Sequence, residues 1–185
     1  PQPEPQPEPE ALYPEPEPEP EHELTGYAMT DTNINPAVTA WLSDSAAAEA
    51  NYGHISTWDT SAVTNFDELF VGITDFNENI SLWNVSSVTS MYRMFENCKF
   101  NNDISNWDVS RVTDMSQMFY SYELVEYVDG ANVTTAIFNQ NISTWNVSSV
   151  TTMKNMFHDS KVFNQEIGDW DVSKVEDMYL SLIHI

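Results

Sequence analysis

A column of alternating acidic and amide side chains is the feature of this sequence best suited to chemistry. One such residue follows each of five regularly spaced tryptophans, in the order Asp59, Asn84, Asp108, Asn146, Asp171. Adjacent rungs of a parallel sheet lie about 4.8 Å apart. Ca²⁺ takes oxygen ligands at about 2.3–2.6 Å, so one ion could bridge neighbouring rungs. The column therefore makes Asp59, Asp108 and Asp171 candidate Ca²⁺ ligands, with a partner protein supplying the missing oxygens.

The same column also has a purely structural interpretation, which we prefer. Five stacked carboxylates would repel one another across the rungs. An asparagine between each pair of aspartates roughly doubles the distance between charges, and amides can hydrogen-bond from rung to rung. On this interpretation the column lines one exposed face of a sheet and needs no ion.

Five Asn-x-Ser/Thr sequons mark possible sites of N-glycosylation: Asn79, Asn84, Asn132, Asn141 and Asn146. Four of them arise from the letters of an internal repeat, so their occurrence has a trivial explanation. Asn132 lies outside the repeat, in an insertion at 120–136, and is the best candidate for modification. We expect a secreted chain that carries a glycan at Asn132.

The insertion also holds three tyrosines that no repeat position explains, Tyr120, Tyr122 and Tyr127. Insertions in repeat proteins emerge as loops on one face, often the binding face. These tyrosines are therefore candidate binding residues.

Sequence signatures of catalysis are missing from this chain. It has no GxSxG, P-loop or GxGxxG motif, and its carboxylates form no apolar-flanked pair suited to acid–base work. The four histidines, His22, His54, His158 and His184, occupy unrelated positions, which argues against zinc. Cys98 is the only cysteine, so no intrachain disulfide can form, and it is expected to pack as a small hydrophobe. We expect no enzyme and no cofactor.

The charge balance excludes several classes of partner. The formal net charge is -23 and the isoelectric point is about 4.1. All six basic residues lie after residue 92, so no basic patch can neutralise phosphates, and nucleic-acid binding is not expected. Adsorption to an anionic membrane is disfavoured for the same reason, and no apolar run is long enough to span a bilayer. Other extracellular or surface proteins are the expected partners.

The elements that must position these residues belong to one repeat. Its tryptophans are separated by 25, 24, 38 and 25 residues, with Ile three positions before each and Val five positions after, at Trp58, Trp83, Trp107, Trp145 and Trp170. A fixed period near 25 is the mark of a solenoid, in which stacked copies close a core that one copy cannot. The tryptophans are predicted to form a buried ladder.

Each copy is predicted to contain a short strand and a short helix. The motif Ile-x-x-Trp-x-Val ends in period-two alternation, which points Trp145 and Val147 inward and Asn146 outward. The following Met-x-x-Met-Phe has the spacing of one helical face, with a threonine before it as N-cap. The predicted fold is an α/β solenoid of right-handed coils, each a short parallel strand plus a short helix.

Three regions are expected along the chain. Residues 1–23 alternate Pro and Glu and should form an extended tail or stalk. Residues 24–54 form a cap with one helix that begins at Asn35-Pro36, places Val38, Trp41 and Leu42 on one face and ends at Tyr52-Gly53. Residues 55–185 form about five coils with the insertion at 120–136. The last coil departs from the pattern without a cap, so the natural protein is expected to continue.

The repeat resembles a known family. Ile-x-x-Trp-x-Val is similar to the strand of leucine-rich repeats, and Met-Phe-Glu-Asn-Cys98 to the ending of their BspA-like class. The whole motif over about 35–178 resembles the 25-residue PARCEL or BspA-like repeat of surface proteins. This resemblance implies an extracellular, leucine-rich-repeat-like solenoid, with adhesion proposed for some members. One departure is that Val occupies the asparagine-ladder position, so the turn backbones need another partner, for which Ser three residues after Trp is the candidate.

Three functional hypotheses remain open. The first is a non-enzymatic extracellular module for adhesion or structural assembly, as part of a filament or wall. The second is a Ca²⁺- or glycan-binding module that uses the exposed strand face. The third, an enzyme, has no residues to support it. Aromatic side chains at the outward strand positions would favour sugar binding, and Thr57, Leu82, Asn106, Thr144 and Asp169 provide none.

Overall fold

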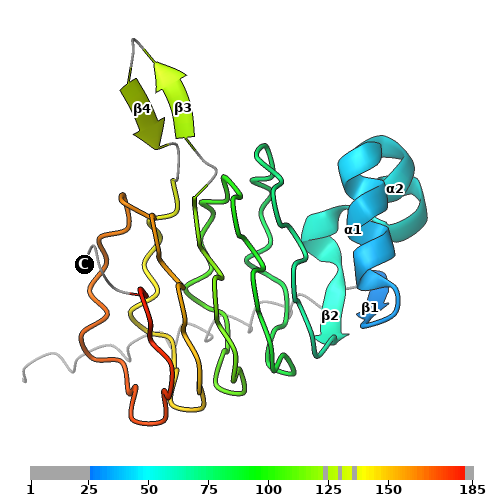
Figure 1. The fold of residues 1–185 in the computed structure, drawn as a ribbon. Helices are drawn as coiled ribbons and strands as arrows, with labels where there is room; N and C mark the ends of the chain where they lie inside the picture. Colours follow the sequence, from blue (N-terminus) through cyan, green and yellow to red (C-terminus); the bar gives the residue numbers. More distant parts are fainter. Residues whose placement is uncertain (1–25, 123–124, 129–130, 135–136, 182–185) are drawn as a thin grey trace, which may run out of the picture.

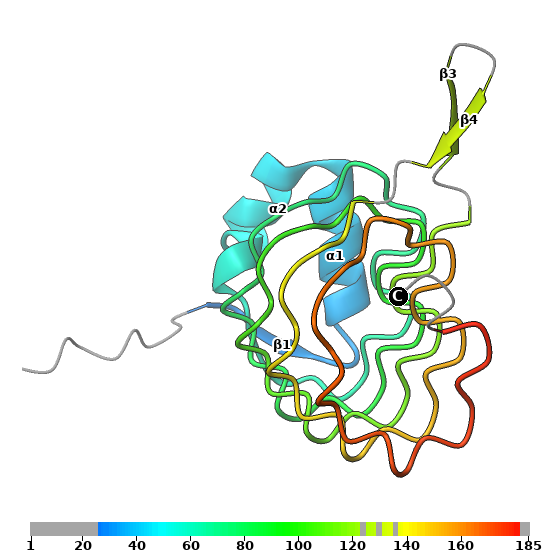
Figure 2. The same cartoon turned by 90° about the vertical axis from the view of Figure 1, so that its left-hand side faces the viewer.

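A helical cap followed by stacked turns of chain makes up the fold (Figure 1). The computed structural model describes residues 26–122, 125–128, 131–134 and 137–181. We call each turn a coil and begin it at the Ile that precedes its Trp, which gives coils 1 to 5 at 55–79, 80–103, 104–141, 142–166 and 167–181. Viewed along the stack, the coils superimpose around a shared interior (Figure 2). The predicted tail at 1–23 lies outside the described residues.

The cap contains a strand and two helices, β1 (Ala28–Thr30), α1 (Ile34–Ser43) and α2 (Ser45–Tyr52). The prediction of one continuous helix was wrong, because the chain turns at Asp44, whose side chain accepts a hydrogen bond from Ala47 N at 3.1 Å and caps α2. Val38 and Trp41, on the predicted apolar face, are buried. Leu42, predicted on the same face, is 38% exposed.

Strand pairing joins the cap to coil 1. A short 3-10 helix at Ile55–Thr57 leads into β2 (Asp59–Ala62), which runs parallel to β1. The approach of the two segments requires glycine at Gly26, where a Cβ atom would lie 1.5 Å from the Thr57 carbonyl oxygen. The cap therefore covers the first coil through backbone bonds as well as through side chains.

The strand and helix predicted for each coil were wrong in detail. Among the described residues of coils 2 to 5, and leaving aside the insertion, no helix occurs and parallel pairing is limited to single bridges. The bridges join the residues seven positions after each Trp: Asn65, Ser90, Asp114, Thr152 and Asp177. Outside the insertion, coil 1 alone among the described coil residues has a strand directly after its Trp.

The Met-Phe segment, predicted as helix, is a run of reverse turns. In coil 1, Leu69 N bonds to Phe66 O at 3.3 Å within the coil, whereas Glu68 N bonds to Tyr92 O of coil 2 at 2.8 Å. Every second N–H is thus used between coils and is not available for a helix. The turn closed by the bond from Leu69 N to Phe66 O recurs in every coil, and its third residue always has positive φ. These residues are Glu68, Arg93, Gln117, Asn155 and Leu180.

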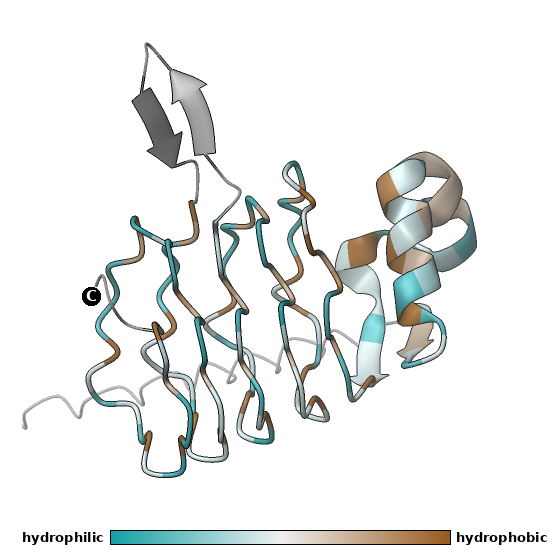
Figure 3. Cartoon of the chain, in the orientation of Figure 1, coloured by the Kyte–Doolittle hydropathy of each residue, from teal (hydrophilic) through white to brown (hydrophobic). Residues whose placement is uncertain are grey.

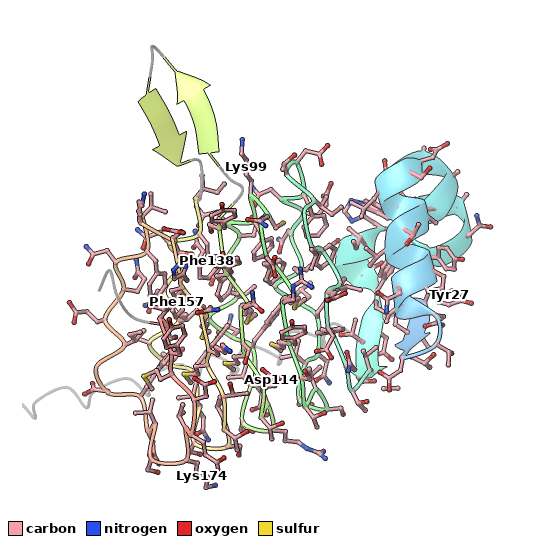
Figure 4. The ribbon with its side chains drawn as sticks, in the orientation of Figure 1. Tyr27, Lys99, Asp114, Phe138, Phe157 and Lys174 are labelled. Carbon is pink, nitrogen blue, oxygen red and sulfur yellow. The ribbon has the colours of Figure 1, made fainter. Side chains whose placement is uncertain are left out.

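Aromatic and aliphatic columns fill the interior of the stack. The five repeat tryptophans are at most 9% exposed, which confirms the predicted buried ladder. Two phenylalanine columns run beside them, and Phe95 stacks on Phe119 with 5.7 Å between ring centroids. Figure 4 labels Phe138 and Phe157, which lie together inside the stack. Hydrophobic residues accordingly recur in every coil in Figure 3. Burial of these columns is the main term that stabilises such a stack.

The insertion forms a hairpin rather than an irregular loop. Strands β3 (Val125–Val128) and β4 (Ala131–Thr134) pair antiparallel, with Tyr127 opposite Asn132 in register. The hairpin projects from one edge of the coil stack (Figure 1). Its position agrees with the predicted insertion at 120–136.

Candidate functional site

The alternating acidic and amide column forms a series of local turns. Each side-chain oxygen accepts a hydrogen bond from the backbone N–H two residues later, for example Asn84 from Ser86 at 3.1 Å and Asp171 from Ser173 at 3.0 Å. The same bond occurs at Asp59, Asp108 and Asn146. The predicted amide bonds from rung to rung were wrong, because the amide oxygens bond within their own coil.

Neighbouring serines lower the pKa of two aspartates in this column. The hydroxyl and the backbone N–H of Ser110 lower the pKa of Asp108, and those of Ser173 lower the pKa of Asp171. Hydrogen bonds to a carboxylate favour its charged form. The candidate metal ligands Asp59, Asp108 and Asp171 lie in alternate coils, and the part of the chain that the structure describes contains no group of three His, Cys, Asp or Glu side chains suited to a metal.

The four repeat sequons lie on the surface. Asn79, Asn84, Asn141 and Asn146 are all exposed, and each accepts a bond from the backbone of the serine two residues later. The fifth, Asn132, lies in β4 of the projecting hairpin. All five sequons are therefore placed on the outside of the coils or on the hairpin strand.

Two of the three candidate tyrosines come together at the base of the hairpin. The ring of Tyr120 stacks on Tyr122 with centroids 6.3 Å apart and meets His158 of coil 4 at 5.2 Å. Tyr122 is 64% exposed. Tyr127 lies further along the chain, in β3.

An asparagine ladder connects the coils at a position that sequence reasoning missed. The asparagine of each Phe-Asn pair accepts the backbone N–H of its counterpart in the next coil: Asn77 from Asn101 at 2.8 Å, and Asn139 from Asn164 at 2.8 Å. Asn101 and Asn139 form the middle step at 2.9 Å. The serine suggested for this task instead donates within its own turn. The recurrence of Phe-Asn in four coils was the available signal.

A threonine ladder runs along a second corner. Thr89, Thr113 and Thr151 each donate both backbone N–H and hydroxyl to the carbonyl of the threonine one coil earlier. In coil 1, Thr64 donates the same two groups to the carboxylate of Asp31, each at 2.7 Å. The hydroxyl and then the backbone N–H of Thr64 lower the pKa of Asp31. Asp31 of the cap thus takes the place of a preceding coil.

Indole N–H groups form a third ladder inside the stack. The Nε1 atoms of Trp83 and Trp107 donate to Ile55 O at 2.8 Å and Ile80 O at 3.3 Å. Trp145 and Trp170 repeat this bond one coil further each time. The isoleucine before each Trp is therefore both a core residue and an acceptor.

The charged side chains between coils 1 and 2 form one compact cluster. Arg93 pairs with Glu68 of coil 1 at 2.6 Å and with Glu96 of its own coil. The carboxylates raise the pKa of Arg93, Glu96 foremost by its hydrogen bond.

Burial raises the pKa of the Cys98 thiol to about 12, and the charge of Asp75 adds to the effect. Such a thiol is largely unreactive at neutral pH.

A cavity of about 290 Å³ opens between the cap and coil 1. We call it the cap cavity and define it by its lining: Trp41, Leu42, Ser45, Ile73, Asp75, Phe76 and Glu78. The first three residues come from α1 and the start of α2, and the others from the outer bend of coil 1. Its lining combines four apolar side chains with Ser45 and two carboxylates, and more of the lining surface is polar than apolar.

Comparisons with known proteins identify a family and no activity. Within the described residues, no helix has the length and apolar character needed to cross a membrane. No curated protein and no solved structure matches the sequence. A family described as "Mycoplasma protein of unknown function, DUF285" matches residues 39–128 and again residues 125–182. Because these two matches cover most of the chain, the protein belongs to the DUF285 family.

Proposed function

We propose that this chain is a non-enzymatic module of an extracellular surface that serves adhesion or structural assembly through contacts with other proteins. In this proposal the coils form a right-handed solenoid related to the leucine-rich repeats of BspA-like or PARCEL surface proteins. Its partners are other extracellular or surface proteins, in a filament or wall.

The observation that carries the proposal is the bonding between coils at three separate places. The asparagine ladder, the threonine ladder and the run of turns each connect neighbouring coils, as Asn101, Thr89 and Glu68 do between coils 1 and 2. Such a stack supports a regular outer surface whose side chains can vary without disturbing the core. Repeat stacks of this kind characteristically use an extended surface for binding.

The hairpin is the proposed point of contact and modification. It projects from the coil edge, its base carries the exposed Tyr122, and β4 carries Asn132. Tyrosine contributes large contact area at low entropic cost, which suits binding surfaces. We place Tyr120, Tyr122 and Tyr127 in the contact and a glycan at Asn132. Intact-mass and glycopeptide mass spectrometry of the native protein tests the glycan, and fully unmodified Asn132 contradicts it.

Surface labelling and adhesion provide the test of the function itself. Antibodies raised against residues 26–181 should label intact, unpermeabilised cells of the source organism, and brief external protease should remove the label. The soluble chain should then inhibit cell-to-cell or cell-to-substrate adhesion in a dose-dependent way. A variant with residues 122–135 deleted is the matched control and should inhibit less. Labelling only after permeabilisation, or no inhibition at saturating chain, contradicts the proposal.

A further inference from the structure

The outer bends of coils 3 and 4 bring apolar side chains to the surface beside the base of the hairpin. Tyr122 is 64% exposed, Ile137 is 38% exposed and Val162 is 41% exposed. Ile137 and Val162 each directly precede a buried phenylalanine, and the residues at the same position in coils 1 and 2 are Asp75 and Lys99. Among coils 1 to 4, apolar residues therefore replace charged ones here only in the coil that carries the insertion and in the next coil.

Contacts between the two bends hold the aromatic part of this surface together. The Tyr120 ring stacks on Tyr122 with centroids 6.3 Å apart and lies 5.2 Å from the ring of His158. Ser121 N donates to His158 O at 3.2 Å, so the bend of coil 3 runs beside that of coil 4. The aromatic side chains thus belong to two neighbouring coils and form one surface.

The two aliphatic residues extend the same surface. Phe138 and Phe163 stack with 6.0 Å between ring centroids, so Ile137 and Val162, which precede them, occupy equivalent positions on neighbouring coils. We call the whole surface the hairpin-base patch and define it as Tyr120, Tyr122, Ile137, His158 and Val162. Exposed apolar side chains that gather in this way are typical of an interaction site.

Lysines flank the hairpin-base patch, although the chain as a whole is strongly acidic. Lys161 is exposed on the bend of coil 4, and Lys99 lies on that of coil 2, where Figure 4 labels it at the edge from which the hairpin projects. Asp159 lies 3.2 Å from His158 Nδ1 and is directed to the patch itself. Because the chain has only six basic residues and a net charge of -23, two lysines beside one apolar patch favour an acidic partner segment.

The chain itself contains a segment of complementary chemistry. Residues 1–23, which lie outside the described residues, alternate Pro and Glu and are interrupted by the apolar pair Leu12 and Tyr13. Proline-rich segments prefer polyproline II and dock on aromatic surfaces at low entropic cost. The prolines and the apolar pair therefore suit the patch, and the glutamates suit the lysines beside it.

A neighbouring copy is the source to which we assign this segment. Alternating Pro and Glu should keep the tail extended, at about 3.1 Å per residue, so that it reaches away from its own coils. An extended spacer also keeps the acidic coils of two copies apart, whereas direct contact between the coils would bring like charges together.

We propose that the hairpin-base patch binds the Pro-Glu tail of a neighbouring copy of this chain. Proline rings lie on Tyr120 and Tyr122, and glutamates pair with Lys99 and Lys161. Because the tail and the patch are different surfaces, the contact is heterologous and can join copies one after another. This inference rests on the proposed function, since it names the protein that the tyrosines contact in an assembly.

Sedimentation velocity of the full chain tests the self-association. At about 0.15 M salt, the weight-average sedimentation coefficient should rise as the concentration increases from about 1 µM to about 1 mM. An excess of a synthetic peptide of residues 1–23 should reverse the rise. The same peptide with every proline replaced by alanine keeps the charge but loses polyproline II, and should compete at least about fivefold more weakly. A coefficient that does not rise with concentration, or equal competition by the two peptides, would overturn the proposal.

Substitutions of exposed residues locate the contact. Tyr122→Ser and Lys161→Glu should each weaken the self-association at least about fivefold. The matched controls in coil 5 are Tyr179→Ser, at a side chain that is 63% exposed, and Lys174→Glu, at another exposed lysine. Each control should change the self-association less than about twofold. Equal losses in a variant and its control would show that the hairpin-base patch is not the binding site.

These measurements use the isolated chain, so they separate this inference from the proposed function. If the chain associates through its tail but surface labelling fails, the contact stands and the proposed function falls. If the soluble chain inhibits adhesion but stays monomeric at every concentration, the proposed function stands and the tail contact falls.

Discussion

The rings of Phe119 and Phe138 stack at 3.8 Å between centroids, although the insertion separates them in sequence. In coil 1, without any insertion, Phe70 and Phe76 stack at 3.9 Å. The two stacks have the same geometry, so the insertion leaves the coil and returns without altering how the coil closes. The hairpin is therefore an addition to coil 3 and not one of its structural parts.

Deleting residues 122–135 should leave the stack folded. The remaining link between Phe119 and Phe138 then has the length of the 96–99 link in coil 2. A shorter loop favours folding by about 1 kcal/mol through closure entropy, so the melting temperature should stay the same or rise by about 2–4 °C. Circular dichroism melting of the two chains measures this. A fall of more than about 10 °C or a loss of cooperativity would mean that the hairpin supports the core.

Shortening Trp107 should destabilise the chain in two steps. Trp107→Phe keeps a ring in the column but removes the indole donor of Ile80 O, at a cost of about 1–3 kcal/mol. Trp107→Ala also empties the site and should cost about 3–5 kcal/mol. Urea denaturation gives both values. Leu82→Ala, at a side chain that is 61% exposed, is the control and should cost under about 0.5 kcal/mol. A cost near zero for Trp107→Phe would show that the indole bond contributes nothing, and equal costs for the two Trp107 variants would show that the emptied site adds nothing.

Asp31 should make part of the stability depend on acid pH. The Thr64 hydroxyl, and to a smaller extent the Thr64 backbone N–H, lower the pKa of Asp31 in the folded chain. An Asp in an unfolded chain has a pKa of about 3.9. Its contribution is complete above that value and is lost as pH falls through the folded pKa.

The matched variant for this effect is Asp31→Asn, which keeps an acceptor but no charge. Its melting temperature should lie below that of the parent chain at pH 7, and the gap should shrink below about pH 4. Asp169→Asn, at an exposed site, should show little gap at either pH. A gap for Asp31→Asn that is constant from pH 7 to pH 3 contradicts the role of its charge.

Ser181 should be a site where a smaller side chain stabilises. It is 1% exposed, its hydroxyl has no hydrogen-bond partner among the described residues, and it takes the place that Met156 fills in coil 4. Ser181→Ala removes the unpaired hydroxyl and should stabilise by about 1 kcal/mol. Ser121→Ala is the counterpart with opposite sign, because its hydroxyl donates to Phe119 O at 3.1 Å. Thermal melting of both variants measures the two effects. Melting-temperature shifts of the same sign would be inconsistent with this account.

Periodicity predicted the parts of the structure that depend on burial. The tryptophan column, the inward Val147, the outward Asn146 and the position of the insertion all follow from residues that recur at one spacing. The same periodicity could not separate strand and helix from turns. Period-two burial at Trp145 and Val147 is satisfied by a turn as well as by a strand, and the Met-Phe spacing likewise fits consecutive turns.

Backbone conformation carried the weakest signal. Positive φ is usual for glycine, yet Glu68 and Leu180 adopt it, so no residue type marked these turns. The asparagine ladder did have a signal in the repeated Phe-Asn pair, which was overlooked because a ladder was sought at the valine position. The cap cavity had none, since Trp41 and Asp75 are distant in sequence and neither occupies a repeat column.

The three ladders donate from each coil to the one before it, whereas the turns donate from each coil to the next, so bonds at separate places join the same two coils. In the turns, coil 1 donates to coil 2, as Glu68 N does to Tyr92 O, whereas along the threonine corner Thr89 of coil 2 donates back to Thr64. A pull along the stack axis stretches every bond of a junction at once, so the bonds share the tension. A pull at one corner loads the bonds between two coils one after another, so each breaks separately. The stack should therefore withstand axial tension far better than peeling, and single-molecule pulling from paired cysteines at different corners would measure the difference.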